Sequence, residues 1–486
     1  MRLSELLREV EFEGSIKNDF DIKFVTDDSR LVRPGALFVC IRHRSFDGHT
    51  AAAEALASGA AAVVTQERLG LENELNVADS RAAYARLCAA LCGHPERKLR
   101  MIGVTGTNGK TTVTTLIRNI LSDSGIKTLL TGTVCNRLGE ESLPSGLTTP
   151  KPPELYSLLS RAVLSGCEAC VAEASSQALA QGRLEGIAFD AAVFTNITRD
   201  HLDYHGTFEN YLAAKKKLFE HSEVSAVNLD DPRADEIIAA SSGKTVTFST
   251  VLDCADYTAK NISLLPEGVS FELVSKGRIE HINFASPGLF SVSNAMAAAV
   301  CAINLGVDPR SAAQSLARSK GVCGRLERVE CGTPYSVIID YAHTPDGLEQ
   351  VLRALRPSCR GKLIVLFGCG GDRDKTKRPL MGAAACKYAD TVIVTSDNPR
   401  SEEPMKIIGD ILKGTDKKRQ GLFIEEDRRR ATALALSLAK PGDTVLLAGK
   451  GHEKYQLICG EKLPLDERET VREILGLPHD TGRKKP

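Results

Sequence analysis

The 486-residue chain lacks a net charge, a long apolar run and an export signal. Its 62 Lys and Arg residues balance 62 Asp and Glu residues, which argues against nucleic-acid binding as the main activity. No stretch reaches the ~18 uncharged apolar residues that a membrane span needs. The N-terminal segment MRLSELLREVEFEG mixes both charges and has no signal-peptide core. We therefore expect a cytoplasmic protein that binds neither nucleic acid nor membrane.

Disulfides are also not expected, although the chain has 14 cysteines, because thiols stay reduced inside cells. Cys88, Cys92 and Cys386 lie in apolar stretches and are predicted to be small buried residues. Cys167 and Cys170 form the one close pair. A zinc site would need a second such pair, so the sequence does not favour a metal or redox role here.

The length predicts about three domains at roughly 150 residues each. We place their limits at residues 1–97, 98–325 and 326–486. Apolar strand-like runs alternate with helix-like runs along most of the chain, which predicts mostly parallel sheets covered on both faces. Residues 255–285 differ and predict a short antiparallel meander.

The strongest local signal is GVTGTNGKTT, residues 103–112, between a predicted strand and a predicted helix. Such glycines let backbone amides curl around phosphate oxygens at a helix N-terminus. Lys110 would reach the β- and γ-phosphates, and Thr111 would ligate Mg²⁺. The match is to a variant, because Val104 stands where the strict Walker pattern has its first glycine. The alternative is a plain glycine turn.

Acidic and basic side chains follow the next strands. Glu173 ends a predicted strand beside the loop and suits Mg²⁺, or it caps a helix. The segment 200–205 holds Asp200, His201, Asp203 and His205, which could bind metal or phosphate or cap the next helix. Lys215 begins a run of three lysines that, taken alone, predicts a solvated helix face.

Three loops in the last third follow predicted strands and should meet at one sheet edge. They carry Arg373, Arg400 and Glu453. Two arginines suit carboxylates and Glu453 suits an ammonium, so a dicarboxylate with two amines fits this pocket. The alternative is that the arginines form weak surface salt bridges.

Several motifs together resemble the Mur ligases, the ATP-dependent amino-acid-adding enzymes of peptidoglycan synthesis. They are GTNGKTT, the Thr148-Thr149-Pro150 run, EASSQAL, TNITRDHLDYHGTFENYLAAKKKLF, GRLE, DYAHTPDGL, GGDRDKTKRP, SDNPR and GKGHEKYQ. The resemblance implies an α/β protein of three domains. A small N-terminal α/β domain would hold the UDP-sugar. A central P-loop-type doubly wound domain would hold ATP, and a Rossmann-like C-terminal domain would hold the amino acid.

The motifs are most similar to the branch that adds meso-diaminopimelate to UDP-N-acetylmuramoyl-L-alanyl-D-glutamate through an acyl phosphate. That resemblance implies ATP as co-substrate and two Mg²⁺ ions, and we expect a monomer. Lys110, His201 and Lys215 would be catalytic, with Lys215 carbamylated by CO₂. Thr111, Glu173 and Lys215 would hold metal.

The resemblance also assigns the remaining binding residues. ATP would contact Gly106, Thr107, Asn108, Gly109, Lys110, Thr111, Thr112, Asn294, Arg325, Asp340 and His343. The UDP-substrate would contact Ser29, Thr148, Thr149, Ser175, Gln181 and Arg183. Diaminopimelate would contact Arg373, Asp397, Asn398, Pro399, Arg400, Gly449 and Glu453.

This chain departs from the family pattern at two places. Asn294 lies in FSVSN rather than F-N-V-x-N. The loop after Ile41 has His43 where the family has glycine, and this affects contacts by Arg44, Ser45 and Phe46.

Two rival functions remain at this stage. The first is a related ligase such as folylpolyglutamate synthase or another Mur enzyme, against which the N-terminal domain and the DNPR run argue. The second is an ATP-switched binding protein without ligase chemistry.

Overall fold

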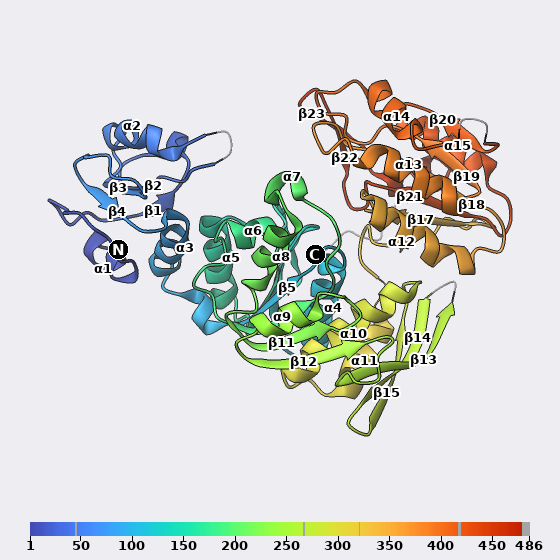
Figure 1. Ribbon diagram of the computed structural model, residues 1–486, viewed down its shortest axis with the longest axis horizontal. Coiled ribbons are helices and arrows are strands. Elements are labelled where there is room, and N and C mark those ends of the chain that lie inside the picture. The colour runs from blue at the N-terminus through green and yellow to red at the C-terminus, as the bar shows by residue number, and fades with distance from the viewer. Residues whose placement is uncertain (44–45, 266–267, 320, 417–418, 479–486) are drawn as a thin grey trace.

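The computed structural model describes residues 1–43, 46–265, 268–319, 321–416 and 419–478. Three lobes follow one another along the chain, with the N-terminal and C-terminal lobes on either side of a central one (Figure 1). Each lobe is built on its own sheet, and a two-stranded hairpin is added in the last lobe. Among the described residues, no helix has the length and apolar character needed to cross a membrane.

The N-terminal lobe is a four-stranded parallel sheet in chain order. Every residue of the two middle strands is buried, as expected when elements cover both faces of a parallel sheet. Asp79 caps helix α3 (Ser80–Leu91) by accepting two backbone amides. The strands are β1 (Phe24–Thr26), β2 (Ala36–Val39), β3 (Ala62–Thr65) and β4 (Glu74–Asn76), and helix α2 (Ala52–Ala57) joins β2 to β3.

The central lobe has an eleven-stranded sheet whose parallel part is doubly wound. Strand β5 (Arg100–Thr105) lies between β10 (Phe189–Phe194) and β9 (Ala169–Glu173), both later in the chain. Beyond them lie β11 (Ser222–Asn228) and β12 (Lys244–Ser249) on one side and β6 (Thr128–Thr131) on the other. The carboxyl ends of these strands therefore form the edge where an open α/β sheet binds its ligands.

The meander predicted for residues 255–285 is present and extends this sheet. Strands β13 (Tyr257–Leu265), β14 (Gly268–Ser275) and β15 (Arg278–Phe284) pair antiparallel with one another, and β13 joins β12 in parallel. At the opposite edge lie β7 (Asn136–Leu138) and β8 (Glu141–Leu143). Helices α4 (Lys110–Asp123) and α10 (Leu289–Asn304) share a buried core with the sheet.

The C-terminal lobe is a six-stranded sheet between two layers of helices. Alternate residues of a strand face opposite sides, so Leu363, Val365 and Phe367 of β18 (Leu363–Phe367) pack with helices α12, α13 and α14. Ile364 and Leu366 pack with α15 and α16 on the other side. The bounds are α12 (Pro345–Leu355), α13 (Lys377–Tyr388), α14 (Pro404–Leu412), α15 (Arg428–Leu438) and α16 (Glu467–Ile474).

The strand order of this sheet brings distant segments together. It runs β16 (Glu327–Arg328), β17 (Ser336–Asp340), β21 (Thr444–Ala448), β18 (Leu363–Phe367), β19 (Thr391–Val394) and β20 (Leu422–Ile424). The hairpin of β22 (Tyr455–Ile458) and β23 (Glu461–Pro464) follows. The predicted α/β class is confirmed, because each lobe is a largely parallel sheet packed with helices.

The cysteine predictions are partly wrong. Cys88 is buried, but Cys92 is exposed and Cys386 is half-buried. Cys92 is the C-cap of α3, where the chain leaves the helix and its apolar neighbours. Cys167 and Cys170 are buried free thiols.

Candidate active site

The glycine loop after β5 is tightly folded. Gly106 has φ +155° and approaches Thr195 so closely that a Cβ there would overlap the threonine Oγ1. Gly109 has φ +88° and precedes α4, which begins at Lys110. The Lys110 Nζ donates to the carbonyls of Gly106 (2.8 Å) and Thr107 (2.9 Å). This loop has the strand–turn–helix context in which backbone amides cradle phosphate.

An oxygen-lined site adjoins the loop at the ends of β9 and β6. Thr111 Oγ1 donates to Glu173 Oε2 (3.1 Å), and Thr133 donates to the same carboxylate through its amide (2.8 Å) and hydroxyl (2.9 Å). Glu173 is 1% exposed. Hydroxyl and carboxylate oxygens are ligands that Mg²⁺ prefers, with water and substrate phosphates completing its shell. The residues present therefore fit this ion.

Lys215 differs sharply from the two lysines that follow it. It is 1% exposed on helix α8 (Phe208–Lys216), whereas Lys216 is half-buried and Lys217 is exposed. Its Nζ donates to the Gly106 carbonyl (2.8 Å) and lies 4.5 Å from the Tyr211 ring centroid. The prediction of a solvated helix face is therefore wrong for Lys215.

The surroundings of Lys215 favour its neutral form. Burial, reinforced by the positive charge of Lys110, lowers the pKa of the Lys215 amine well below its usual range. A neutral amine can react with CO₂, whereas an ammonium cannot. This geometry and charge suit the predicted carbamate.

The His and Asp residues of segment 200–205 do not gather into a metal site. Within the residues described, no three His, Cys, Asp or Glu side chains could hold a metal together. His201, with φ +54°, precedes α7 (Leu202–His205) and faces the cleft, and burial lowers its pKa. His205 bonds Ser176 Oγ (3.0 Å). The capping alternative fails too, since His201 at the N-cap of α7 makes no side-chain capping hydrogen bond and Thr207 caps α8.

Contacts from the C-terminal lobe, and from the segment that leads into it, reach the phosphate loop. Arg325 Nη2 donates to Thr111 Oγ1 (3.2 Å), and its guanidinium stacks 4.7 Å from the Tyr341 ring centroid. Asp346 Oδ2 accepts from Asn108 Nδ2 (3.1 Å) and Thr198 Oγ1 (3.2 Å). Sequence reasoning missed Asp346, although it lies within DYAHTPDGL.

The other predicted nucleotide residues line the same cleft of about 330 Å³, which both lobes form. Asn294 on α10 faces Gly109, whose Cβ would lie 2.5 Å from its Oδ1. His343 lies at the C-terminal-lobe wall. The Asp340 carboxylate accepts hydrogen bonds from the backbone amides of Leu326 and Ala342, each at 2.7 Å. Burial raises the pKa of this carboxyl group.

Five of the six residues predicted for the UDP-substrate form a chain of hydrogen bonds. Thr149 Oγ1 bonds Ser175 Oγ (3.2 Å), and Arg183 donates to the Thr149 carbonyl (2.7 Å) and to Gln181 Oε1. Thr148 joins through Thr133 (3.1 Å) and Glu173, because Thr133 donates to the Glu173 carboxylate and Thr149 Oγ1 donates to the Glu173 carbonyl (2.6 Å).

The sixth residue, Ser29, comes from the N-terminal lobe. It begins a short 3₁₀ helix two residues after Asp27, which ion-pairs with Lys151 of the central lobe (2.9 Å). The Asp27–Lys151 contact was not predicted. In the loop after Ile41, Phe46 is exposed, and Arg44 and Ser45 lie outside the described residues.

The three C-terminal loops meet because β21, β18 and β19 are neighbours in the sheet. Asn398 Nδ2 donates to Glu453 Oε2 (2.9 Å), and a Cβ on Gly449 would lie 2.7 Å from Asp397 Oδ2. Arg373 and Arg400 flank Gly370.

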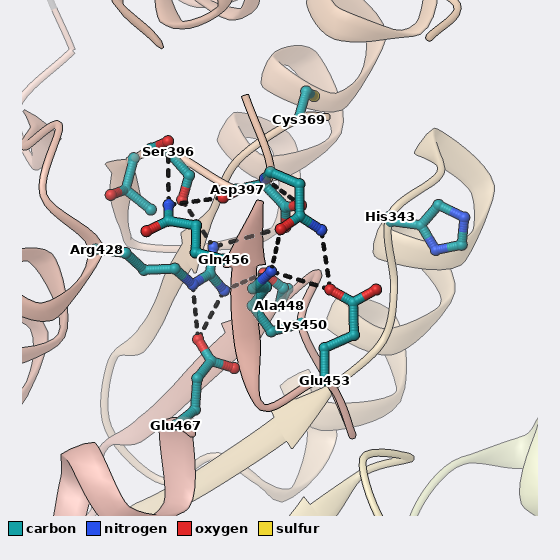
Figure 2. A network of polar contacts seen from close by, with 12 residues as sticks. His343, Cys369, Ser396, Asp397, Arg428, Ala448, Lys450, Glu453, Gln456 and Glu467 are labelled. Carbon is teal, nitrogen blue, oxygen red and sulfur yellow. Dashed lines mark hydrogen bonds and ion pairs between the residues drawn. The ribbon is translucent and has the colours of Figure 1, made fainter. Parts of the chain in front are cut away.

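Among the described residues, neither arginine finds a partner for the surface salt bridge given as the alternative. Arg400 donates to the Gly371 carbonyl (2.7 Å) and Arg373 to that of Asp372 (2.9 Å). Pro399 is buried beside them. Sequence reasoning missed two buried cations behind these loops, Lys450 and Arg428 (Figure 2). Lys450 is part of the GKGHE motif, so the sequence motif alone could have identified it.

Comparison with known proteins accounts for all three lobes. Residues 21–89 match the Mur ligase family catalytic domain, residues 104–302 the Mur ligase middle domain, and residues 324–451 the Mur ligase glutamate ligase domain. The chain belongs to the Mur ligase family. The resemblance seen in its motifs is thereby confirmed, and the chain is an ATP-dependent amide ligase of the Mur type.

Curated relatives of this Mur ligase are similar over almost their whole length. One, from Syntrophomonas wolfei subsp. wolfei, is named UDP-N-acetylmuramoyl-L-alanyl-D-glutamate--2,6-diaminopimelate ligase. It is 43% identical over an alignment of 487 positions, which covers 98% of this chain and 99% of the relative. A Clostridioides difficile protein of the same name is 40% identical over 483 residues, with the same coverage.

Solved structures agree with the fold. A structure of a UDP-N-acetylmuramoyl-L-alanyl-D-glutamate--2,6-diaminopimelate ligase has a TM-score of 0.71 and 34% identity, covering 98% of this chain and 99% of the other. Mycobacterium tuberculosis folylpolyglutamate synthase has a TM-score of 0.62 at 18% identity, covering 82% of this chain and 95% of the other. The second likeness shows the fold alone.

Proposed function

We propose that this Mur ligase joins meso-diaminopimelate to UDP-N-acetylmuramoyl-L-alanyl-D-glutamate, with ATP cleaved to ADP and phosphate, in peptidoglycan biosynthesis. The observation that carries the proposal is the hydrogen-bond path from Arg325 through Thr111 to Glu173. Arg325 leads into the lobe that bears the acceptor loops, and Asp346 of that lobe accepts from Asn108 of the phosphate loop (3.1 Å), so the two are coupled as a ligase requires. The names of the full-length relatives support the choice of amino acid.

In the first step, a carboxylate of the UDP-linked dipeptide attacks the γ-phosphorus of ATP, forming an acyl phosphate and releasing ADP. Lys110 and the amides of the glycine loop would stabilise the negative charge on the transferring phosphoryl group. Burial lowers the pKa of the Lys110 amine, while the carboxylate of Glu173 opposes this shift. The hydrogen-bonded set around Thr149 and Arg183 would orient the dipeptide end.

Thr111 and Glu173 would hold one Mg²⁺, and Lys215 would serve a second after its neutral amine adds CO₂ and loses a proton. When bound, these ions neutralise phosphate charge as Lewis acids. The carbamate replaces the neutral Lys215 amine by an anion. This anion is attracted to the Lys110 ammonium, whereas a protonated Lys215 would be repelled by it.

In the second step, the deprotonated amine of diaminopimelate attacks the acyl carbonyl, and phosphate leaves with the electrons of the broken C–O bond. Arg373 and Arg400 would bind carboxylates of the amino acid, and Glu453 would bind an ammonium. Closure of the C-terminal lobe over the cleft would exclude the water that otherwise hydrolyses the acyl phosphate.

The test is phosphate release together with product mass for a panel of amino acids. We expect release only when the UDP-dipeptide and the amino acid are both present, with diaminopimelate preferred. Phosphate release in the absence of both the UDP-dipeptide and the amino acid would favour an ATP-switched binding protein. A preference for glutamate with a folate acceptor would favour folylpolyglutamate synthase, the rival ligase. A cytoplasmic location and a monomeric state stay predictions.

A further inference from the structure

A completely buried lysine lies directly behind the acceptor loops. Lys450 follows strand β21 and has 0% exposure. Its Nζ donates to Asn398 Oδ1 (2.6 Å) and to Glu453 Oε2 (2.9 Å; Figure 2), and it lies 5.5 Å from the Tyr455 ring centroid. A buried ammonium is costly unless it is paired and hydrogen-bonded. Lys450 is therefore expected to need both partners.

The ammonium fixes the orientation of the Asn398 side chain. The Oδ1 atom accepts from Lys450 and from the backbone amide of Leu457 (2.9 Å). With two donors on that side, the Nδ2 atom must face the opposite way, where it donates to Glu453 Oε2 (2.9 Å). A flipped amide would place its NH₂ group against two donors.

The same ammonium also orients Glu453. Lys450 and Asn398 both donate to Oε2, and the other oxygen, Oε1, points away from Lys450 (Figure 2). One carboxylate oxygen is thus held by the protein, and the other is available to a ligand. Lys450 thereby ties the loop after β19 to the loop after β21, with Asn398 on one and Glu453 on the other.

We propose that Lys450 is a positioning residue for the acceptor amino acid, which aims Glu453 Oε1 at a substrate ammonium by holding Asn398 and Glu453 together. This inference rests on the proposed function, because it takes Glu453 and Asn398 as part of the diaminopimelate pocket. Lys450 itself does not touch the substrate, and it has no role in forming the acyl phosphate.

The matched variants are Lys450→Met and Lys454→Met. Methionine preserves the apolar stem but removes the ammonium. Lys454 is four residues away, with its side chain 73% exposed and paired to Asp466 (3.3 Å). We expect Lys450→Met to raise the KM for diaminopimelate ~10-fold to ~100-fold, because the buried Asn398 and the half-buried Glu453 lose their charged donor. The KM values for ATP and UDP-dipeptide should stay within about twofold, and Lys454→Met should match the wild type.

A second readout separates positioning from a general loss of structure. Hydroxylamine is a small nucleophile that traps acyl phosphates as hydroxamates and needs no amino-acid pocket. We expect Lys450→Met to form hydroxamate from ATP and UDP-dipeptide at the wild-type rate. Equal losses of hydroxamate and amino-acid activity would show a merely structural lysine and overturn the inference.

Lys450→Gln keeps the test decisive if the methionine variant does not fold. Its amide retains two N–H donors without the charge, so we expect a smaller rise in the diaminopimelate KM at unchanged hydroxamate formation. An unchanged diaminopimelate KM in a folded variant would overturn the inference alone. A wild-type enzyme that makes hydroxamate but does not use diaminopimelate would overturn the proposed function, and the inference with it.

Discussion

Replacement of Lys215 by alanine tests the proposed chemistry most directly. The three consecutive lysines offer internal controls, because only Lys215 is buried, at 1% exposure, and bonded to the phosphate-loop carbonyl of Gly106. Lys216 is half-buried and Lys217 is exposed. The three positions therefore share a sequence context but differ in environment.

The expected size of the effect follows from the charge that a carbamate supplies. Metal-assisted stabilisation of phosphoryl charge is worth several kcal/mol, and a loss of about 3–4 kcal/mol lowers the rate by ~10²-fold to ~10³-fold. We therefore expect Lys215→Ala to lose nearly all activity. Lys216→Ala and Lys217→Ala should stay within about threefold of the wild type, as surface changes do.

The assay is coupled phosphate release with and without added bicarbonate or short-chain carboxylic acids. In the alanine variant the truncated side chain leaves a space beside Gly106, and we expect a small acid to occupy it and partly restore activity. Full activity of Lys215→Ala would refute the carbamate. A defect as large in Lys217→Ala would refute the assignment of the buried lysine.

The remaining predictions concern the phosphate loop, the acceptor pocket and pH. Lys110→Ala should lower turnover by ~10²-fold or more, since it removes a charge aimed at the phosphoryl group; turnover within a few-fold of wild type would defeat the phosphate-loop assignment. The wild type should prefer diaminopimelate to lysine by at least ~10²-fold in kcat/KM, because lysine would leave Arg400 without its carboxylate, at a cost of roughly 3–5 kcal/mol. Arg400→Ala should weaken diaminopimelate binding far more than ATP binding, and a defect seen mainly in the ATP parameter would contradict this. The Lys215 amine, whose pKa is lowered, is neutral above that pKa and protonated below it. Bicarbonate should therefore restore the activity of CO₂-depleted enzyme better at alkaline than at acidic pH. Equal restoration across that range would count against carbamylation.

Local sequence signals were sufficient to predict the strands and helices and the loops that follow them. The phosphate loop lies between β5 and α4 as predicted, and the meander after residue 255 was visible in its change of pattern. Such features depend on neighbours in the chain, because glycine conformations, apolar alternation and helix starts are local properties. Cys92 was predicted to be buried but is exposed at the C-cap of α3. The hydrophobicity of a segment does not show where its helix ends and its last residues become exposed.

The amino-acid sequence determined the α/β class and the family, because nine short motifs occur in order along nearly the whole chain. It also identified the residue types for phosphate, carboxylate and ammonium. The family resemblance singled out Lys215 among three lysines, but only the tertiary structure showed that its side chain is buried, since helix periodicity alone does not say which face packs against the phosphate loop. The tertiary structure also decided the partners of Arg325, Asp346 and Lys450, which lie 214, 238 and 52 residues away in the chain. Contacts at such separations are set by strand order and by how the lobes meet, and no local pattern encodes either.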